Sequence, residues 1–427
     1  MLVAIQVGSY SDNLSVTSSA GSNYSITYVN GSLTINPKAL TITANAQSTP
    51  YGTVVITGAG STQFTSSGLV GSDAVNSITL ATNQLVTTNA GTSGIAITPS
   101  AAVGSGLSNY NITYNTGTVT VTPKALTITA NAQSTTYGTA LTLGTSNYIA
   151  TGLINSDQVT AVTLLSNSAA IISATTSAGT YNITPSAASG SGLSNYNISY
   201  VNGSLTVNKA PLTVTGSNTT VTYNGGVQTN NTATISGNKG SDTFNILGYA
   251  TGTNAATYND TLSVTSSAIG NYNVTYVNGS LKINKAPLTV TGATTSLTYS
   301  AGVQTNNTAT ITGRQGSDTI SVSGYATGTN VGTYNEILSV SSPVISNYSV
   351  TINNGSLTIT KASLTVTGVT TSVTYNGVAQ TNNAATITGR QGSDVISVSG
   401  YSSGTNAGTY NDILSVSSSA LTNYNVT

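Results

Sequence analysis

The chain has 427 residues, a length that would ordinarily hold about three domains. Only 4% of the residues are charged, and the nine acidic and nine basic side chains cancel. This balance excludes the basic stripe of a nucleic-acid-binding protein and leaves no field that would attract an anionic membrane. The absence of Cys and His excludes Ser-His-Asp and Cys-His nucleophiles and His/Cys zinc sites. No stretch approaches the roughly 18 apolar residues that span a bilayer.

An internal repeat organises the chain. A phrase of the form Lys-Ala-Leu-Thr-Ile-Thr, with one residue inserted before Leu in the later copies, occurs five times, and a Tyr follows its Leu by eleven positions. The leucines are Leu40, Leu126, Leu212, Leu288 and Leu364, and they are separated by 86, 86, 76 and 76 residues. Because self-similarity at a fixed period marks the unit that folds, we expect one module per copy.

The repeat positions predict the following division of the chain. Residues 1–37 match the C-terminal part of a truncated repeat. Two longer repeats follow at 38–123 and 124–208, then two shorter repeats at 209–284 and 285–360. Residues 361–427 form a repeat that lacks its last hairpin.

Each repeat opens and closes with a pattern that indicates strands. The opening Leu-Thr-Ile/Val-Thr alternates apolar and hydroxyl side chains, as expected for a strand with one buried face. Near its end, the Tyr272–Tyr276 run and the Leu281–Ile283 run flank Asn278-Gly279. Asn-Gly between alternating runs predicts an antiparallel hairpin with a type I′ turn. The same dipeptide recurs at Asn30-Gly31, Asn202-Gly203 and Asn354-Gly355, and Thr116-Gly117 takes its place in one repeat.

The fold class that these patterns predict is all-β, in small modules. No segment shows a helical period over ten residues. Only two or three residues join successive modules, so we expect an elongated, semi-stiff rod of beads. A parallel β-solenoid is the alternative architecture, but the repeat length and the predicted hairpins argue against it. The orphan hairpin at residues 24–36 and the incomplete last repeat leave head-to-tail strand donation between chains as a further alternative.

These phrases resemble the MBG and YDG repeat modules of long bacterial haemagglutinin-like adhesins. The resemblance rests on the opening strand at 38–43, on Tyr51-Gly52 and Tyr137-Gly138, on the loops that end in Asp73 and Asp157, and on the closing run at 109–114. Repeats three and five carry Tyr-Asn-Gly and repeat four carries Tyr299-Ser300, as a sister subtype would. The resemblance implies β-grasp-like or β-sandwich modules in tandem, outside the cell, with no defined ligand.

Acidic residues recur at two places in the repeats. One set follows Gly-Ser or Asn-Ser, and the other follows Tyr-Asn or Tyr-Ser: Asp73, Asp157, Asp242, Asp318 and Asp394, and then Asp12, Asp260, Glu336 and Asp412. We interpret both sets as turn caps, with local ion pairs from Lys239, Arg314 and Arg390 to the aspartates that follow them. One or two carboxylates per repeat are too few for a calcium site. A repeat of about 80 residues is too small for the cleft in which a glycosidase holds its two carboxylates, and turn chemistry already explains these positions. No catalytic residue, metal site or cofactor is therefore expected.

The tyrosines are the remaining candidates for ligand contact. Most stand at alternating strand positions, where packing into a small core is expected. Tyr249, Tyr325 and Tyr401 lie in a Gly-Tyr-x-x-Gly-Thr-Asn loop, where an exposed ring could make weak contacts to sugars that add by avidity.

The sequence and the resemblance together predict stalk or spacer repeats of a bacterial surface or secreted adhesin, without catalysis. The location expected is the cell exterior, on the outer surface of a Gram-negative bacterium. Host-surface or matrix glycans or proteins are the partners expected, through parts of the parent protein outside this chain; nucleic acid and membrane insertion are not. A multivalent, low-affinity carbohydrate-binding repeat is the alternative function.

Overall fold

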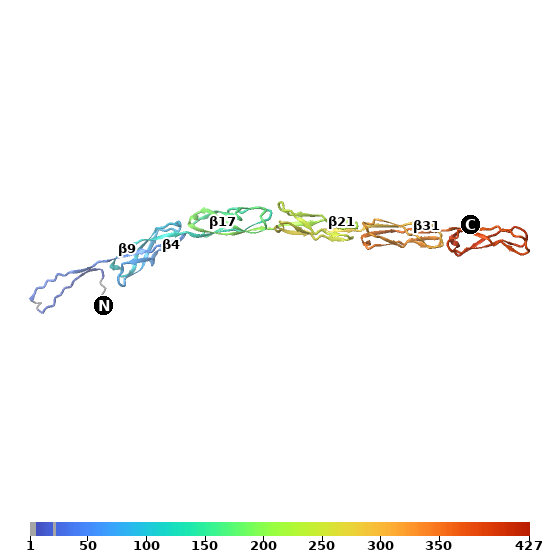
Figure 1. The fold of residues 1–427 in the computed structure, drawn as a ribbon. Coiled ribbons are helices and arrows are strands. Elements are labelled where there is room, and N and C mark those ends of the chain that lie inside the picture. Colours follow the sequence, from blue (N-terminus) through green and yellow to red (C-terminus); the bar gives the residue numbers. More distant parts are fainter. Residues whose placement is uncertain (1–5, 20–22) are drawn as a thin grey trace. The chain divides into compact units, whose positions relative to one another are not determined.

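The computed structural model describes residues 6–19 and 23–427, so residues 1–5 and 20–22 of the predicted segment 1–37 lie outside the description. It is all-β, as predicted, and consists of many small sheets (Figure 1). The chain divides into two compact units: Met1–Ala210 with Gly270–Asn273, and Pro211–Ile269 with Val274–Thr427.

Repeat two, in the first unit, shows the plan of a longer repeat. A three-stranded sheet has β11 at its centre, antiparallel to β14 and parallel to β18. A four-stranded sheet has the order β12-β19-β17-β15, and a short ribbon pairs β13 with β16. The strands are β11 (Lys124–Ala130), β12 (Gln133–Thr136), β13 (Leu141–Thr142), β14 (Tyr148–Thr151), β15 (Gln158–Leu165), β16 (Ile171–Ile172), β17 (Gly179–Ser191), β18 (Tyr196–Val201) and β19 (Gly203–Asn208).

Repeat one has the same two sheets, ordered β6-β3-β9 and β4-β10-β8-β7-β5. Its strands are β3 (Lys38–Ala44), β4 (Gln47–Pro50), β5 (Gly58–Ser61), β6 (Phe64–Ser67), β7 (Ala74–Thr82), β8 (Ile95–Ser105), β9 (Tyr110–Asn115) and β10 (Gly117–Thr122). Before it, β1 (Gly8–Ser11) pairs antiparallel with β2 (Ser32–Ile35).

The shorter repeats keep the first sheet and divide the second into smaller pieces. Repeat three contains β20 (Ala210–Gly216), β21 (Asn218–Thr222), β22 (Gln228–Thr229), β23 (Ala233–Ser236), β24 (Asn245–Leu247), β25 (Thr251–Gly252), β26 (Thr257–Asn259), β27 (Ser263–Thr265), β28 (Tyr272–Val277) and β29 (Ser280–Asn284). Repeat four contains β30 (Ala286–Gly292), β31 (Thr294–Thr298), β32 (Gln304–Thr305), β33 (Ala309–Thr312), β34 (Ser321–Ser323), β35 (Thr327–Gly328), β36 (Gly332–Asn335), β37 (Ser339–Ser341), β38 (Tyr348–Asn353) and β39 (Ser356–Thr360). Repeat five contains β40 (Ala362–Gly368), β41 (Gln380–Thr381), β42 (Ala385–Thr388), β43 (Ser397–Ser399), β44 (Ser403–Gly404), β45 (Ser415–Ser417) and β46 (Tyr424–Val426).

The opening strand behaves as its alternation predicts. In β3, Leu40, Ile42 and Ala44 are buried while the hydroxyl residues between them remain partly accessible. They pack against Ile78 of β7 and Ile97 of β8, which belong to the other sheet. Repeat one is therefore a β-sandwich, with its core between the two sheets. Every sheet takes its strands from a single repeat, which is unlike the continuous coils of a solenoid.

The Asn-Gly hairpin prediction is wrong. In repeat two, β18 and β19 flank Asn202-Gly203 but belong to different sheets, and neither residue has a positive φ. Both strands instead pair in parallel with the opening segment of the same repeat, β18 with β11 and β19 with β12. Gly203 is needed for a close approach: a Cβ there would lie 2.5 Å from the carbonyl oxygen of Ala130.

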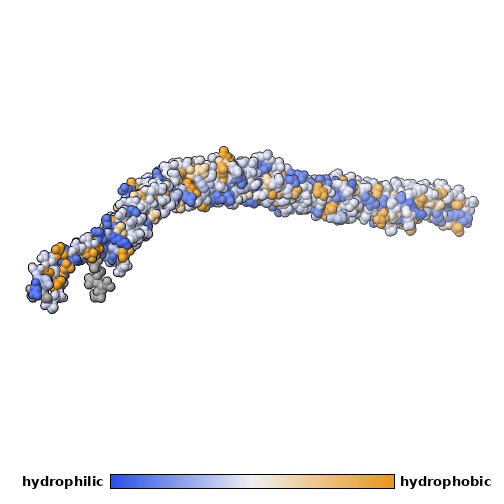
Figure 2. Space-filling view, turned by 60° about the vertical axis from the view of Figure 1, so that its left-hand side comes forward, coloured by the Kyte–Doolittle hydropathy of each residue, from blue (hydrophilic) through white to orange (hydrophobic). Residues whose placement is uncertain are grey.

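A short 3-10 helix precedes each closing run. In repeats one to five these helices are Leu107–Asn109, Leu193–Asn195, Ile269–Asn271, Ile345–Asn347 and Leu421–Asn423, and each ends on Asn with Tyr as the next residue. Across residues 6–19 and 23–427, no helix has the length and apolar character needed to cross a membrane. Figure 2 shows apolar side chains scattered over the visible face, without one broad apolar patch.

Candidate functional site

The most regular feature of the molecule is the junction between consecutive repeats. The Tyr that follows the second strand of one repeat packs edge-on against the Tyr that opens the closing run of the next. Ring centroids lie 5.4–5.6 Å apart at interplanar angles of 77–81°, in the pairs Tyr51–Tyr196, Tyr137–Tyr272, Tyr223–Tyr348 and Tyr299–Tyr424. This T-shaped geometry is favourable for aromatic rings, so each junction has a defined aromatic contact.

The strands hold these tyrosines in place. At the third junction, Tyr223 follows β21, and its N–H donates to the carbonyl oxygen of Asn284 at the end of β29 (2.9 Å). Tyr348 is the first residue of β38, directly after a 3-10 helix. Both rings are buried, with 4% and 3% of their surface exposed. Tyr375, which has the same place in repeat five but no Tyr packed on it, is 65% exposed.

In the second unit, the apolar core continues across the junctions. One buried cluster contains Leu281 from the closing strand of repeat three, Leu288 from the opening strand of repeat four, and both junction tyrosines. An equivalent cluster joins repeats four and five through Leu357 and Leu364. Neighbouring repeats therefore share buried surface, and their stabilities are coupled as in other repeat proteins.

A carboxylate anchors each tyrosine pair in the shorter repeats. Asp318 Oδ2 accepts hydrogen bonds from the hydroxyls of Tyr223 (3.0 Å) and Tyr348 (2.5 Å), which belong to different repeats. Asp394 does the same for Tyr299 (3.0 Å) and Tyr424 (2.6 Å). Burial, with a smaller contribution from these bonds to Asp, raises the pKa of Tyr348 to about 12.

The acidic loop residues thus have different partners from those predicted. We expected local ion pairs from Arg314 to Asp318 and from Arg390 to Asp394. Among the described residues no such ion pair forms, and the carboxylates bind tyrosine hydroxyls instead. The sequence contained a usable signal, since in these shorter repeats each Asp precedes the Tyr of its own repeat by 30 residues.

The longer repeats use a variant of this junction. Asp157 Oδ2 accepts from the Tyr196 hydroxyl (2.8 Å), and the Tyr196 hydroxyl in turn receives the N–H of Ile154 (2.9 Å). The Asn155 side chain donates to the carbonyl of Val86 in the preceding repeat (3.0 Å). Burial and the bond to Asp157 raise the pKa of Tyr196 to about 12, and the backbone bond to Ile154 lowers it.

Asparagine side chains complete the junctions. Asn347, which is 2% exposed, accepts from the N–H of Ala255 (2.8 Å) and donates to Asn254 Oδ1 (3.0 Å) in the preceding repeat. Asn423 makes the matching bonds to Val331 and Asn330. A buried amide whose donor and acceptor both bond across the junction fixes the register of the two repeats.

The three predicted ligand tyrosines lie next to these junction loops. Tyr249, Tyr325 and Tyr401 are all half-buried. Tyr249 packs against the cluster of Val214, Leu262 and Val264. The Asn of the same loop in repeat three is Asn254, which is bonded to Asn347. The structure therefore joins this loop to the neighbouring repeat, a role that the sequence did not suggest.

A second carboxylate lies inside each shorter repeat. Asp260 is 1% exposed and accepts from Asn230 Nδ2 (3.0 Å to Oδ2), from the N–H of Ala250 (2.7 Å) and from the N–H of Gly279 (3.1 Å). It links three loops rather than capping one turn as predicted. Glu336, 2% exposed, occupies the same place in repeat four. Among the described residues, no three acidic side chains lie together as a candidate metal site.

The corresponding residue of repeat five, Asp412, makes stability depend on pH. The N–H of Ser402 (2.7 Å) and Asn382 Nδ2 (2.9 Å) bind its carboxylate, and the bond to Ser402 is the main cause that lowers its pKa. A carboxyl whose folded pKa lies below its unfolded value stabilises the fold above the unfolded value, near pH 4, and loses that contribution as pH falls further. We expect hydrogen exchange in repeat five to accelerate below about pH 4.

The Asp412→Asn variant is the control for this prediction, because it cannot titrate. Its exchange rates, corrected for intrinsic pH dependence, should not change over the same pH range. Identical pH profiles of the two proteins would contradict the assignment.

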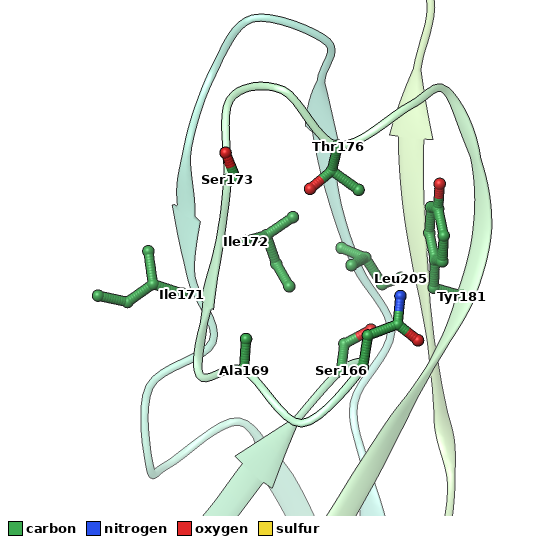
Figure 3. Close-up of a pocket in the computed structure, with 9 residues that line it drawn as sticks. Ser166, Ala169, Ile171, Ile172, Ser173, Thr176, Tyr181 and Leu205 are labelled. Atoms are coloured by element: carbon green, nitrogen blue, oxygen red, sulfur yellow. The ribbon is translucent and has the colours of Figure 1, made fainter.

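Two small cavities lie within single repeats. One of about 150 Å³ lies in repeat two, where Ile172, Leu205 and Tyr181 line it; Ile172 points inward and Ile171 points away (Figure 3). Another of about 210 Å³ lies in repeat five beside Tyr375 and Tyr410. Both fall below the roughly 300–1,000 Å³ typical of small-molecule sites.

The fold and its junctions define a class of protein: tandem arrays of small β-sandwich repeats. Equivalent tyrosines in successive repeats make the contacts that join them. Residues 40–120 and 126–206 match the family model of the MBG domain (YGX type). Repeats one and two therefore match MBG domains in tandem, which confirms the MBG part of the resemblance for these two repeats. A search of curated proteins finds no match.

Solved structures give only distant similarities. A crystal structure of Drosophila N-cadherin EC1-3 aligns with 54% of this chain and 98% of its own, at 10% identity and a TM-score of 0.20. N-cadherin EC1-4 aligns with 62% and 82%, at 7% identity and a TM-score of 0.17. The Bacillus anthracis TIE protein aligns with 82% and 73%, at 8% identity and a TM-score of 0.20. At these scores the similarities carry no argument about function.

Proposed function

We propose that this chain is a run of non-catalytic spacer repeats from a bacterial surface or secreted adhesin, located outside the cell. The observation that carries the proposal is the recurring junction, in which buried tyrosines and asparagines bond to residues of the neighbouring repeat. A junction of this kind resists bending between neighbours, as a spacer requires. Low charge supports the role, since few ionic contacts would change with salt.

Small-angle X-ray scattering of the whole chain tests the spacer role. A compact globule of this length would have a radius of gyration of about 22 Å. We expect a value more than twice as large, together with a β-sheet circular dichroism spectrum that excludes an unfolded chain. A radius near that of the globule would contradict the proposal.

A glycan array probed with the same chain distinguishes the spacer role from the carbohydrate-binding alternative. Spacer repeats should leave the array blank. Binding to defined sugars that weakens when Tyr249, Tyr325 and Tyr401 are replaced together by alanine would support the carbohydrate-binding alternative instead.

A further inference from the structure

The two ends of each complete repeat lie side by side as parallel strands. In repeat two, β11 pairs with β18 from Lys124↔Tyr196 to Thr129↔Val201. Beyond a break of a few residues, β12 pairs with β19 from Gln133↔Leu205 to Thr136↔Asn208, also in parallel. Both ladders have the same offset of 72 residues. The first 13 and the last 13 residues of the repeat thus lie parallel in a single register, with one ladder in each sheet.

The other repeats contain the same pairing. In repeat one, β3 pairs with β9 and β4 with β10. In repeat four, β30 pairs with β38 and β31 with β39, at an offset of 62 residues. The ten-residue difference between long and short repeats therefore lies between the two segments and leaves their pairing intact.

The two segments cross from one sheet to the other at the same place. There Gly203 lies against the carbonyl of Ala130, and a Cβ would be only 2.5 Å from that oxygen. Gly117, Gly279 and Gly355 make the same close approach in their own repeats. The glycine lets the two segments stay adjacent as they pass from one sheet to the other.

Chain connectivity directs any tension into this pairing. Only Pro123 separates β10 from β11, and only Lys209 separates β19 from β20. A pull along the chain therefore enters repeat two at the start of β11 and leaves at the end of β19. Because the paired strands are parallel, these points lie at opposite ends of the ladder. The strands can separate only by sliding, which loads all ladder hydrogen bonds together.

We propose that each complete repeat is a shear clamp, a module whose end strands resist tension applied along the chain. The hydrogen bond from the N–H of Tyr137 to the carbonyl of Asn208 (2.9 Å) extends the clamp to the junction tyrosine. The clamp is a property of each single repeat. It would hold for a carbohydrate-binding array as well as for a spacer, so its failure would leave the proposed function standing.

Single-molecule force spectroscopy on the whole chain tests the clamp by changing the direction of pull. The chain has no Cys, so handles can be attached at chosen exposed positions. The Ala125→Cys/Lys209→Cys pair pulls repeat two from opposite ends of the ladder. The matched Ala125→Cys/Ser194→Cys pair pulls both segments from the same end, which breaks the bonds one after another.

We expect the first pair to rupture at a force about twofold or more above the second at the same loading rate, because many hydrogen bonds share the load. Both variants should unfold in denaturant at the same midpoint as the unmodified chain, which shows that direction alone differs. Equal rupture forces, or a lower force for the Lys209 pair, would overturn the clamp.

Discussion

Replacing Asp260 by alanine is expected to destabilise repeat three by about 3–5 kcal/mol. The substitution leaves Asn230 Nδ2 and the N–H groups of Ala250 and Gly279 without their acceptor. A buried donor that loses its partner costs about 1–3 kcal/mol, and three donors are affected here. Hydrogen exchange of peptides from residues 209–284, followed by mass spectrometry, measures the local free energy of opening.

The chain itself supplies the control for this experiment. Glu336 occupies the equivalent place in repeat four and binds the equivalent Asn and Gly. The Asp260→Glu variant should therefore lose at most about 1.5 kcal/mol of stability, because neighbouring side chains can adjust to one additional methylene group. If the alanine variant were as stable as the glutamate variant, the carboxylate would not be the centre of this network.

Replacing Tyr299 by alanine is expected to cost about 3–5 kcal/mol, the range for a large buried aromatic residue. Tyr299 packs on Tyr424 and lies in the apolar cluster that joins repeats four and five. The loss should therefore appear as faster hydrogen exchange in both repeats, whereas a residue in an isolated domain would affect one. Tyr299→Phe removes only the bond to Asp394 and should cost about 1.5–3 kcal/mol.

Tyr375 gives a matched control, because it has the same sequence position but is 65% exposed. Tyr375→Ala should change stability by no more than about 0.5 kcal/mol. An effect of Tyr299→Ala that is confined to repeat four, or no larger than that of Tyr375→Ala, would contradict coupling through the junction.

Sequence patterns predicted a strand correctly where the pattern within the segment itself determines which side chains are buried. The alternation at Leu40, Ile42 and Ala44 gave a strand with the correct buried face. The expectation that most tyrosines pack inward holds for Tyr51, Tyr137, Tyr223 and Tyr299, although the surface they cover belongs to the next repeat. The burial of these tyrosines could be inferred from their alternating positions in the sequence. The neighbouring repeat on which each ring packs could not.

The errors share one physical cause. Asn278-Gly279 is a strong local hairpin signal, yet β29 pairs with β21 and β26 and leaves β28 in another sheet. Asp318 was assigned to Arg314, four residues away, but it binds tyrosines 30 and 95 residues distant. In each case a long-range partner displaced the local one that a sequence pattern favours, because burial makes the distant contact stronger.

The junction also bears on how the gene can change. Each complete repeat has one junction Tyr after its second strand and another at the start of its closing run. The Tyr137–Tyr272 pair shows that a longer repeat accepts a shorter one as its successor. Unequal recombination that deletes or adds one whole copy would therefore rebuild a complete joint from existing parts. Alleles of different copy number should all fold, so selection could adjust reach without altering any single residue.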